Sequence, residues 1–229
     1  MNKLFSRILS LIYPNRCISC GRVQRENSLC AACEAGVEIN PYSACPRCGG
    51  NRGACDCKAT DFAFDGISAP FVYTGTVRQG LMNFKFYRRP DAAAYFARAM
   101  ADRLHRDTGG IHFDAVAFVP MTDAGRRARG YNQAELLAGQ LAELLDLPLM
   151  TDALVQVRAT AVQHKLGRRA RFENVRGAYA AAKDVRGKHL LLVDDIRTTG
   201  ATLHECAHVL RTGGAASVFC TVAAIRPYK

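Results

Sequence analysis

The sequence predicts an α/β protein with a small cysteine-rich domain at its N-terminus. Two observations support this fold class. From about residue 61 onward, apolar strand-like segments alternate with helical patterns, which is the order expected of a parallel sheet covered by helices. Ten cysteines occur in 229 residues, and eight of them lie between Cys17 and Cys57. We therefore expect two domains, over residues 1–60 and 61–229.

The first part of the larger domain is expected to alternate short strands and helices. Two short strands are indicated between Phe62 and Tyr73, where aromatic and β-branched residues alternate with small or polar ones. Further on, the pattern predicts helices over 76–86 and 92–105, a buried strand over 115–120, a polar basic loop, and a helix from about 132 to 145.

The strongest strand–helix unit lies near the C-terminus. Residues 188–193 are almost entirely apolar, as in a strand that is buried on both faces of a parallel sheet. A helix over 201–211, closed by Gly213 and Gly214, and a strand over 217–224 follow. This order favours a Rossmann-like doubly wound sheet, whose ligand lies at the carboxyl ends of the strands.

The composition suggests an anionic partner and excludes a membrane-spanning protein. A formal net charge of +11 concentrates phosphates and nucleic acid around a surface, although a basic surface also serves solubility. No run of 18 apolar residues is present. The apolar residues of Met1–Tyr13 fall on one helical face, and no cleavage site follows, so we expect an amphipathic helix rather than a signal peptide, and a cytoplasmic protein.

The first four cysteines have the spacing of a zinc site. Cys17 and Cys20 are separated by two residues, as are Cys30 and Cys33. Two residues between thiolates allow both sulfurs to reach one ion, and two such knuckles complete a tetrahedral site. Such a closed site stabilises a fold or presents a partner surface and performs no catalysis.

The next four cysteines predict a second site with a less regular pattern. Cys45 and Cys48 form a knuckle, whereas only one residue separates Cys55 from Cys57. One or two structural Zn²⁺ ions are therefore expected. A disulfide framework is the alternative, and the paired knuckles and the lack of a signal peptide favour zinc.

The turn between the last strand–helix pair is equipped to bind a phosphorylated ligand. Two carboxylates, Asp194 and Asp195, end the predicted strand, and hydroxyls and a glycine open the helix. Free amides at a helix N-terminus and Thr hydroxyls form a cradle for one phosphate, and the carboxylates suit ribose-like hydroxyls or a hydrated metal ion. An acidic turn with a threonine helix cap is the simpler interpretation.

The complete pattern, strand, Asp-Asp, Thr-Thr-Gly-Ala-Thr, helix, resembles the phosphoribosyl-pyrophosphate (PRPP) motif of type I phosphoribosyltransferases. The resemblance implies that Asp194 and Asp195 are catalytic and hold the ribose hydroxyls, with Mg²⁺ bound alongside PRPP. It assigns the 5′-phosphate to the loop of Arg197, Thr198, Thr199, Gly200, Ala201 and Thr202. Some purine enzymes of this class carry an aspartate as general base where this chain has Thr198, and threonine cannot do that near neutral pH.

Further motifs extend the resemblance over essentially the whole chain. These are Tyr13-Pro-Asn-Arg-Cys17-Ile-Ser-Cys20-Gly, Asn83-Phe-Lys-Phe86, Arg129-Gly-Tyr-Asn-Gln133 and Gln163-His-Lys-Leu166. Together they are similar to the ComF family, the competence-type phosphoribosyltransferase-like proteins with a double zinc ribbon. The resemblance implies a loop after Pro120 that faces pyrophosphate and a flap over 158–176. The residues that it places there are Lys85, Arg126, Arg129, Asn132, Gln163 and Arg171.

Family membership implies a role in DNA uptake and recombination. The partners that it implies are PRPP, single-stranded DNA in a basic cleft, and a competence helicase or other recombination protein on the zinc ribbon. Tyr131, Phe172 and Tyr179 are candidates either for base stacking or for packing. The alternative function is a phosphoribosyltransferase of nucleobase metabolism, against which the zinc module argues.

Overall fold

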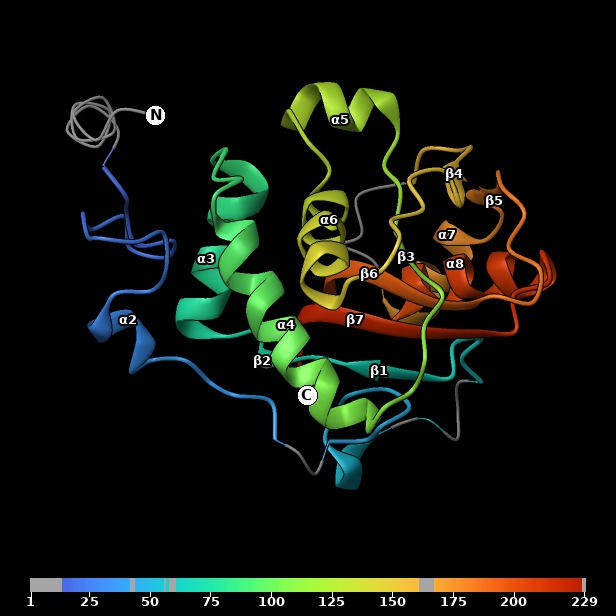
Figure 1. Cartoon of the computed structure of the whole chain (residues 1–229), viewed down its shortest axis with the longest axis horizontal. Helices are drawn as coiled ribbons and strands as arrows, with labels where there is room; N and C mark the ends of the chain where they lie inside the picture. The colour runs from blue at the N-terminus through green and yellow to red at the C-terminus, as the bar shows by residue number, and fades with distance from the viewer. Residues whose placement is uncertain (1–13, 42–43, 56, 58–60, 161–166, 228–229) are drawn as a thin grey trace.

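A parallel five-stranded sheet forms the centre of the computed structural model, which describes residues 14–41, 44–55, 57, 61–160 and 167–227 (Figure 1). The helix expected over 1–13 lies outside the described residues. The strand order is β1-β7-β6-β3, and β2 pairs with the far end of β7. The strands are β1 (Gly66–Ser68), β2 (Phe71–Val72), β3 (Ala115–Phe118), β6 (His189–Arg197) and β7 (Ser217–Ile225).

Strand β6 lies in the middle of the sheet between β3 and β7. Leu190 to Val193 are fully buried, as their apolar character predicts. The strand does not end at Val193, however, but continues through the two aspartates to Arg197, because β7 keeps pairing with it as far as Ile225. Strand β6 therefore carries charged side chains into the interior at its carboxyl end.

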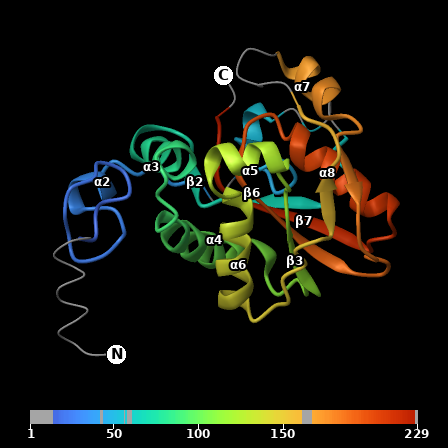
Figure 2. The same ribbon diagram turned by 90° about the horizontal axis from the view of Figure 1, so that it is seen from above.

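Helices cover both faces of the sheet (Figure 2). Helices α4 (Ala92–Thr108) and α6 (Gln133–Leu145) pack together on one face, and α8 (Ala201–Thr212) packs on the other. Helix α3 (Gly75–Phe86) lies beside α4. Each of these helices buries an apolar stripe, including Phe96 and Met100 of α4 and Leu137 and Leu141 of α6, and this periodicity explains why the sequence predicted them.

A short helix, α5 (Asp123–Arg129), occupies the segment where the sequence indicated a basic loop. The hydroxyl of Thr122 caps it by accepting a hydrogen bond from the amide of Gly125 at 3.1 Å, and Gly130 ends it with a φ of 91°. None of its residues is buried, so it lacks the apolar periodicity on which helix prediction depends.

The segment expected to act as a flap is a small structure on the edge of the sheet domain. Strands β4 (Leu154–Gln156) and β5 (Tyr179–Ala181) pair in antiparallel fashion, and α7 (Arg168–Val175) lies between them in sequence and packs on α8. Arg158 joins the two ends of the segment by donating from Nη2 to the carbonyls of Asn174 and Arg176, at 3.0 and 2.9 Å.

The two cysteine segments dock at different places (Figure 1). The first, which contains α2 (Ala31–Glu34), lies against α3, where Asn83 donates to the carbonyls of Ile18 and Ser19 at 2.9 and 2.7 Å. The second, which contains the 3₁₀ turn η1 (Arg52–Ala54), lies beneath β1, and the carbonyl of Pro46 accepts from the amide of Ile67 at 3.0 Å. None of the helices in the described part of the chain combines the length and apolar character needed to cross a bilayer.

Candidate active site and metal centres

A pair of carboxylates and a lysine form the centre of the candidate active site. The backbone amide of Asp195 donates to Oδ1 of Asp194 at 2.8 Å, so the carboxyl group of Asp194 is held by the backbone of its neighbour. The ammonium of Lys85, near the end of α3, lies 3.3 Å from Oδ2 of Asp195. Asp195 is buried. Lys85, which the sequence assigned to pyrophosphate, is thus a counter-ion of Asp195.

The protonation of this pair reflects its burial. Burial and the charge of Asp195 raise the pKa of Asp194 to about 8. The charge of Asp195 raises the pKa of Lys85, which burial alone would lower. The site therefore disfavours a negative charge on Asp194 beside that of Asp195, and a divalent cation or the hydroxyls of a sugar would favour the ionised pair.

The predicted phosphate loop is a turn that leads from β6 into α8. Gly200 has a φ of 82°, and a Cβ at this position would lie 2.9 Å from Cε1 of Phe62, so only glycine suits the turn. A small hollow beside the loop is lined by Asp194, Thr198 and Thr202 among others, and it opens on the N-terminus of α8. The arrangement of hydroxyls and helix amides matches an anion cradle.

Arg197 has a different environment from the rest of the loop. Its side chain is only 1% exposed and is the largest fully buried side chain in the described residues. It interacts electrostatically with Cys48, Cys57 and Cys45 of the second cysteine cluster. The sequence placed Arg197 among the residues that hold the 5′-phosphate, whereas the structure buries its guanidinium next to a candidate metal centre.

The other basic residues predicted to bind pyrophosphate gather around α5. Arg126 forms an ion pair with Glu135 at 2.8 Å, and Arg129 donates to Gln133 at 3.0 Å and lies 5.4 Å from the ring centre of Phe86. Asn132 is 3% exposed and has a structural role, because it caps α6 and donates to the carbonyl of Val119 at 3.0 Å.

Two predicted site residues and the three aromatic candidates remain. Arg171 lies on α7, and Gln163 lies outside the described residues. The three aromatic residues that the sequence left between stacking and packing all pack: Tyr131 against Phe84, Phe172 against Phe62 and His204, and Tyr179 within the core.

Two further residues belong to the site, although sequence reasoning did not find them. Phe62 lies under Gly200 and stacks on Phe64, with ring centres 4.7 Å apart. Nδ1 of His204, in the second turn of α8, accepts a hydrogen bond from the amide of Ala63 at 3.1 Å. The aromatic pair directly after the cysteine segment is the sequence signal that indicates a junction between ribbon and loop.

The eight cysteines form two compact clusters, as the sequence predicted. The first cluster contains Cys17, Cys20, Cys30 and Cys33, and the second contains Cys45, Cys48, Cys55 and Cys57. The sulfurs of each cluster lie within 4.8 Å of one another. The one-residue spacing of the last two cysteines therefore still allows convergence.

The sulfur geometry fits zinc and does not fit disulfides. Sγ of Cys20 lies 3.7 Å from Sγ of Cys30, and Sγ of Cys45 lies 3.5 Å from Sγ of Cys57. A Zn–S bond of about 2.3 Å places the sulfurs of a tetrahedral site roughly 3.8 Å apart, whereas a disulfide requires about 2.05 Å. Burial opposes ionisation of the Cys17 thiol, yet backbone amides that hydrogen-bond its sulfur lower its pKa to about 6, which favours the thiolate that zinc binds.

Comparison with known proteins identifies both parts of the chain. The model of the phosphoribosyl transferase domain family matches residues 131–229, and that of the double zinc ribbon domain matches residues 8–61. The sheet, the loop at its carboxyl edge and the cysteine clusters thus define a protein with a type I phosphoribosyltransferase fold and an N-terminal zinc ribbon.

Relatives that span nearly the whole chain define the family more narrowly. The chain is 33% identical to the DNA utilization protein YhgH of Salmonella typhi over 198 residues, which cover 83% of this chain and 87% of the relative. It is 29% identical to Competence protein F of Haemophilus influenzae over 87% of this chain and 92% of the relative. The protein belongs to the ComF family.

Solved structures of similar fold include phosphoribosyl enzymes. The glutamine PRPP amidotransferase of B. subtilis superposes with a TM-score of 0.41 and 21% identity, over 62% of this chain and 30% of that chain. The adenine phosphoribosyltransferase of Thermoanaerobacter pseudethanolicus gives a TM-score of 0.38 at 17% identity, over 61% and 83%.

The cluster geometry predicts two zinc ions per chain. Cys20→Ser and Cys55→Ser each remove one ligand that is not fully buried, so each variant is expected to lose one ion and keep the other. Elemental analysis of purified wild type and of both variants checks this, with Cys206→Ser, far from either cluster in sequence and buried in α8, as the control that keeps two. A wild-type content of one ion would mean that the second cluster does not bind zinc.

The raised pKa of Asp194 predicts a pH-dependent stability. Between about pH 4 and 8, the folded protein binds a proton at Asp194 that the unfolded chain has released, so this residue destabilises the fold increasingly as pH rises. Asp194→Asn removes that penalty. Its free energy of unfolding relative to that of wild type is therefore expected to rise by at least about 1 kcal/mol between pH 5 and pH 8.

Urea unfolding across that pH range measures this effect. The control is Asp152→Asn, because Lys183 lowers the pKa of this exposed carboxyl and the difference from wild type should then be constant from pH 5 to 8. A constant difference for Asp194→Asn as well would contradict the prediction.

Proposed function

We propose that this protein binds PRPP together with Mg²⁺ and uses this site in DNA uptake. The observation that carries the proposal is the joint placement of Asp194, Asp195 and the 198–202 loop at the carboxyl edge of the sheet. In this arrangement the loop and the N-terminus of α8 would hold the 5′-phosphate, and the carboxylates would accept hydrogen bonds from the ribose hydroxyls.

The carboxylate pair also fits the metal ion that accompanies a diphosphate. Oxygen ligands are those that Mg²⁺ prefers, and the clustering of two acids supplies the negative charge. The ion would neutralise charge on the diphosphate leaving group. The guanidinium groups of Arg126, Arg129 and Arg171 would bind its remaining oxygens, and Lys85 would be released from Asp195 or would remain beside it as a second cation.

Phosphoribosyl transfer at this site would depend on electrostatic stabilisation. Displacement of diphosphate at the anomeric carbon passes through a state with positive charge on the ribose, which the two carboxylates stabilise. Thr198 provides no general base for an incoming nucleobase. The acceptor would therefore be activated by another group or would need no activation.

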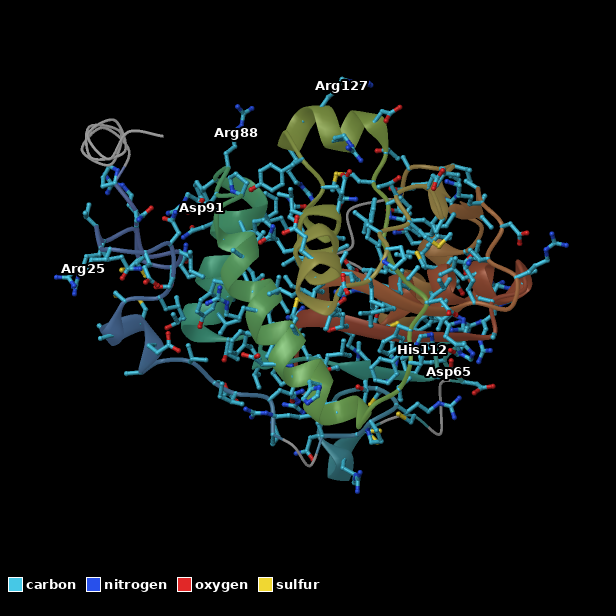
Figure 3. The ribbon with its side chains drawn as sticks, in the orientation of Figure 1. Arg25, Asp65, Arg88, Asp91, His112 and Arg127 are labelled. Atoms are coloured by element: carbon cyan, nitrogen blue, oxygen red, sulfur yellow. The ribbon has the colours of Figure 1, made fainter. Side chains whose placement is uncertain are left out.

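The basic surface around α5 supports binding of single-stranded DNA. Arg88 and Arg127 project outward at the same end of the molecule, from the end of α3 and from α5 (Figure 3). Phe86 and Tyr87 beside them are 48% and 69% exposed. Exposed aromatics next to arginines suit stacked bases and a phosphate backbone. The names DNA utilization protein and Competence protein F among the relatives agree with this partner.

The family also suggests where the protein works and with what. We expect a cytoplasmic protein that presents its zinc ribbon to a competence helicase or another recombination protein. The two domains would then have separate roles. Residues 1–60 would bind the protein partner, and residues 61–229 would bind PRPP and DNA.

Isothermal titration tests PRPP binding. Wild type should bind PRPP in the presence of Mg²⁺ and bind it weakly when Mg²⁺ is left out of the buffer. Asp194→Ala/Asp195→Ala should weaken binding at least roughly tenfold, because charged hydrogen bonds to the ribose are lost. The matched control, Asp152→Ala/Asp184→Ala, removes two exposed carboxylates elsewhere and should bind as wild type does. Absence of heat with wild type and Mg²⁺ would end this proposal.

Salt titration tests the DNA surface. The logarithm of the affinity for single-stranded DNA should fall linearly with the logarithm of salt concentration, and neutralising Arg88, Arg127 and Arg129 to Gln should reduce the slope by about 2. The same number of charges removed from other faces, as Arg25→Gln/Arg52→Gln/Arg98→Gln, should change the slope much less. Equal slopes for the two triple variants would place the DNA elsewhere.

A further inference from the structure

Arg197 helps to line the hollow beside the predicted phosphate loop, yet its side chain is almost completely buried. Strand β6 carries this residue beneath the phosphate loop, where its side chain is 1% exposed. A guanidinium stays charged under all ordinary conditions, and removing it from water costs several kcal/mol unless an opposite charge lies nearby.

The second cysteine cluster lies in the right place to supply that charge. Arg197 lies within electrostatic range of Cys48, Cys57 and Cys45, and also of Arg168, whose like charge adds to the cost of burying the guanidinium. Four thiolates outweigh the charge of one Zn²⁺, so a zinc-loaded cluster is a buried anion next to a buried cation.

The phosphate loop rests on the Arg197 side chain. A Cβ at Gly200 would lie 3.6 Å from Nε of Arg197 and 2.9 Å from Cε1 of Phe62. The loop thus has the guanidinium and an aromatic ring as its floor. The guanidinium therefore supports the loop from below, and Arg197 directly precedes Thr198 in the chain.

Packing connects the same cluster to the strands that hold Arg197. Arg197 is paired with Ile225 of β7, and Gly49, next to Cys48, lies so close to Ile225 that a Cβ there would be 2.2 Å from its Cδ1. The side-chain amide of Asn40 donates to the carbonyl of Gly49 at 3.3 Å and to that of Ala69 at 3.1 Å. The first cluster, in contrast, docks on α3.

We propose that the second cysteine cluster, when it holds zinc, is the counter-charge of Arg197, which in turn positions the phosphate loop. Zinc in this cluster and a phosphate ester in the loop then stabilise one another, since coupling between two binding sites is reciprocal. The half of this inference that concerns the ligand rests on the proposed function, whereas the pairing of Arg197 with the cluster does not. Arg197 is a positioning residue in this account.

Zinc release from the ligand-free protein tests the pairing. Transfer of zinc to a coloured chelator such as 4-(2-pyridylazo)resorcinol should occur in two phases, which Cys20→Ser and Cys55→Ser assign to the two clusters. Arg197→Met should accelerate release from the second cluster roughly tenfold, as expected when a group that supports metal ligands is lost. Release from the first cluster should not change.

A conservative variant separates charge from packing. Arg197→Lys keeps the positive charge and should restore most of the slow release, which a purely structural role of the guanidinium would not predict. Identical release from the second cluster in wild type and Arg197→Met would overturn the proposal. Equal acceleration of both phases would also overturn it, because it would indicate general loosening of the fold.

The coupling between zinc in the second cluster and a ligand in the loop can be tested on wild type alone. This measurement keeps the coupling testable if Arg197→Met does not fold. Ribose 5-phosphate, at a concentration that titration shows to be saturating, should slow release from the second cluster several-fold and leave the first cluster unaffected. Binding without any change in the second phase would overturn the coupling. Absence of ribose 5-phosphate and PRPP binding would instead count against the proposed function, and the ligand-free comparison of Arg197 variants would still decide the pairing.

Discussion

The structure depends on how charged side chains are accommodated at the carboxyl end of β6. This strand is apolar and fully buried as far as Val193, and it then carries two carboxylates and a guanidinium within four residues. Charges in the interior of a sheet destabilise a fold unless each faces an opposite charge. Lys85 of α3 lies against Asp195, and the second cysteine cluster lies within electrostatic range of Arg197. Elements distant in sequence are thus needed to stabilise a single strand end.

This requirement explains why the zinc ribbon and the sheet domain form one packed unit. The first cysteine segment holds α3 through Asn83, two residues before Lys85, and the second packs beneath β1 and against Ile225. Each cluster therefore supports an element that contributes to the candidate active site. A ribbon that only presented a partner surface would not need either contact.

The surface around the site has a different character from its floor. Arg126 and Arg129 are held by Glu135 and Gln133 on α6, while Arg88 and Arg127 project outward beside exposed aromatic rings. Arg88 has a φ of 52°, a backbone conformation that costs free energy in a residue with a side chain. The proposed function assigns the arginines at the rim to DNA and the paired charges below to PRPP.

The sequence by itself determined the fold class, the family, the cysteine clusters and the position of the turn between β6 and α8 that is predicted to bind phosphate. Those features depend on local patterns, namely apolar periodicity, knuckle spacing, and the run from Asp194 to Thr202. Local patterns can be recognised in the sequence alone. Helix α5 escaped prediction because its residues are exposed and lack that periodicity. Only the tertiary structure decided that Arg197 faces the second cluster, that Lys85 pairs with Asp195, that Asn132 caps a helix and that Phe62 supports Gly200. Each of these is a contact between separate segments or a choice among competing partners, and side-chain type alone does not determine either.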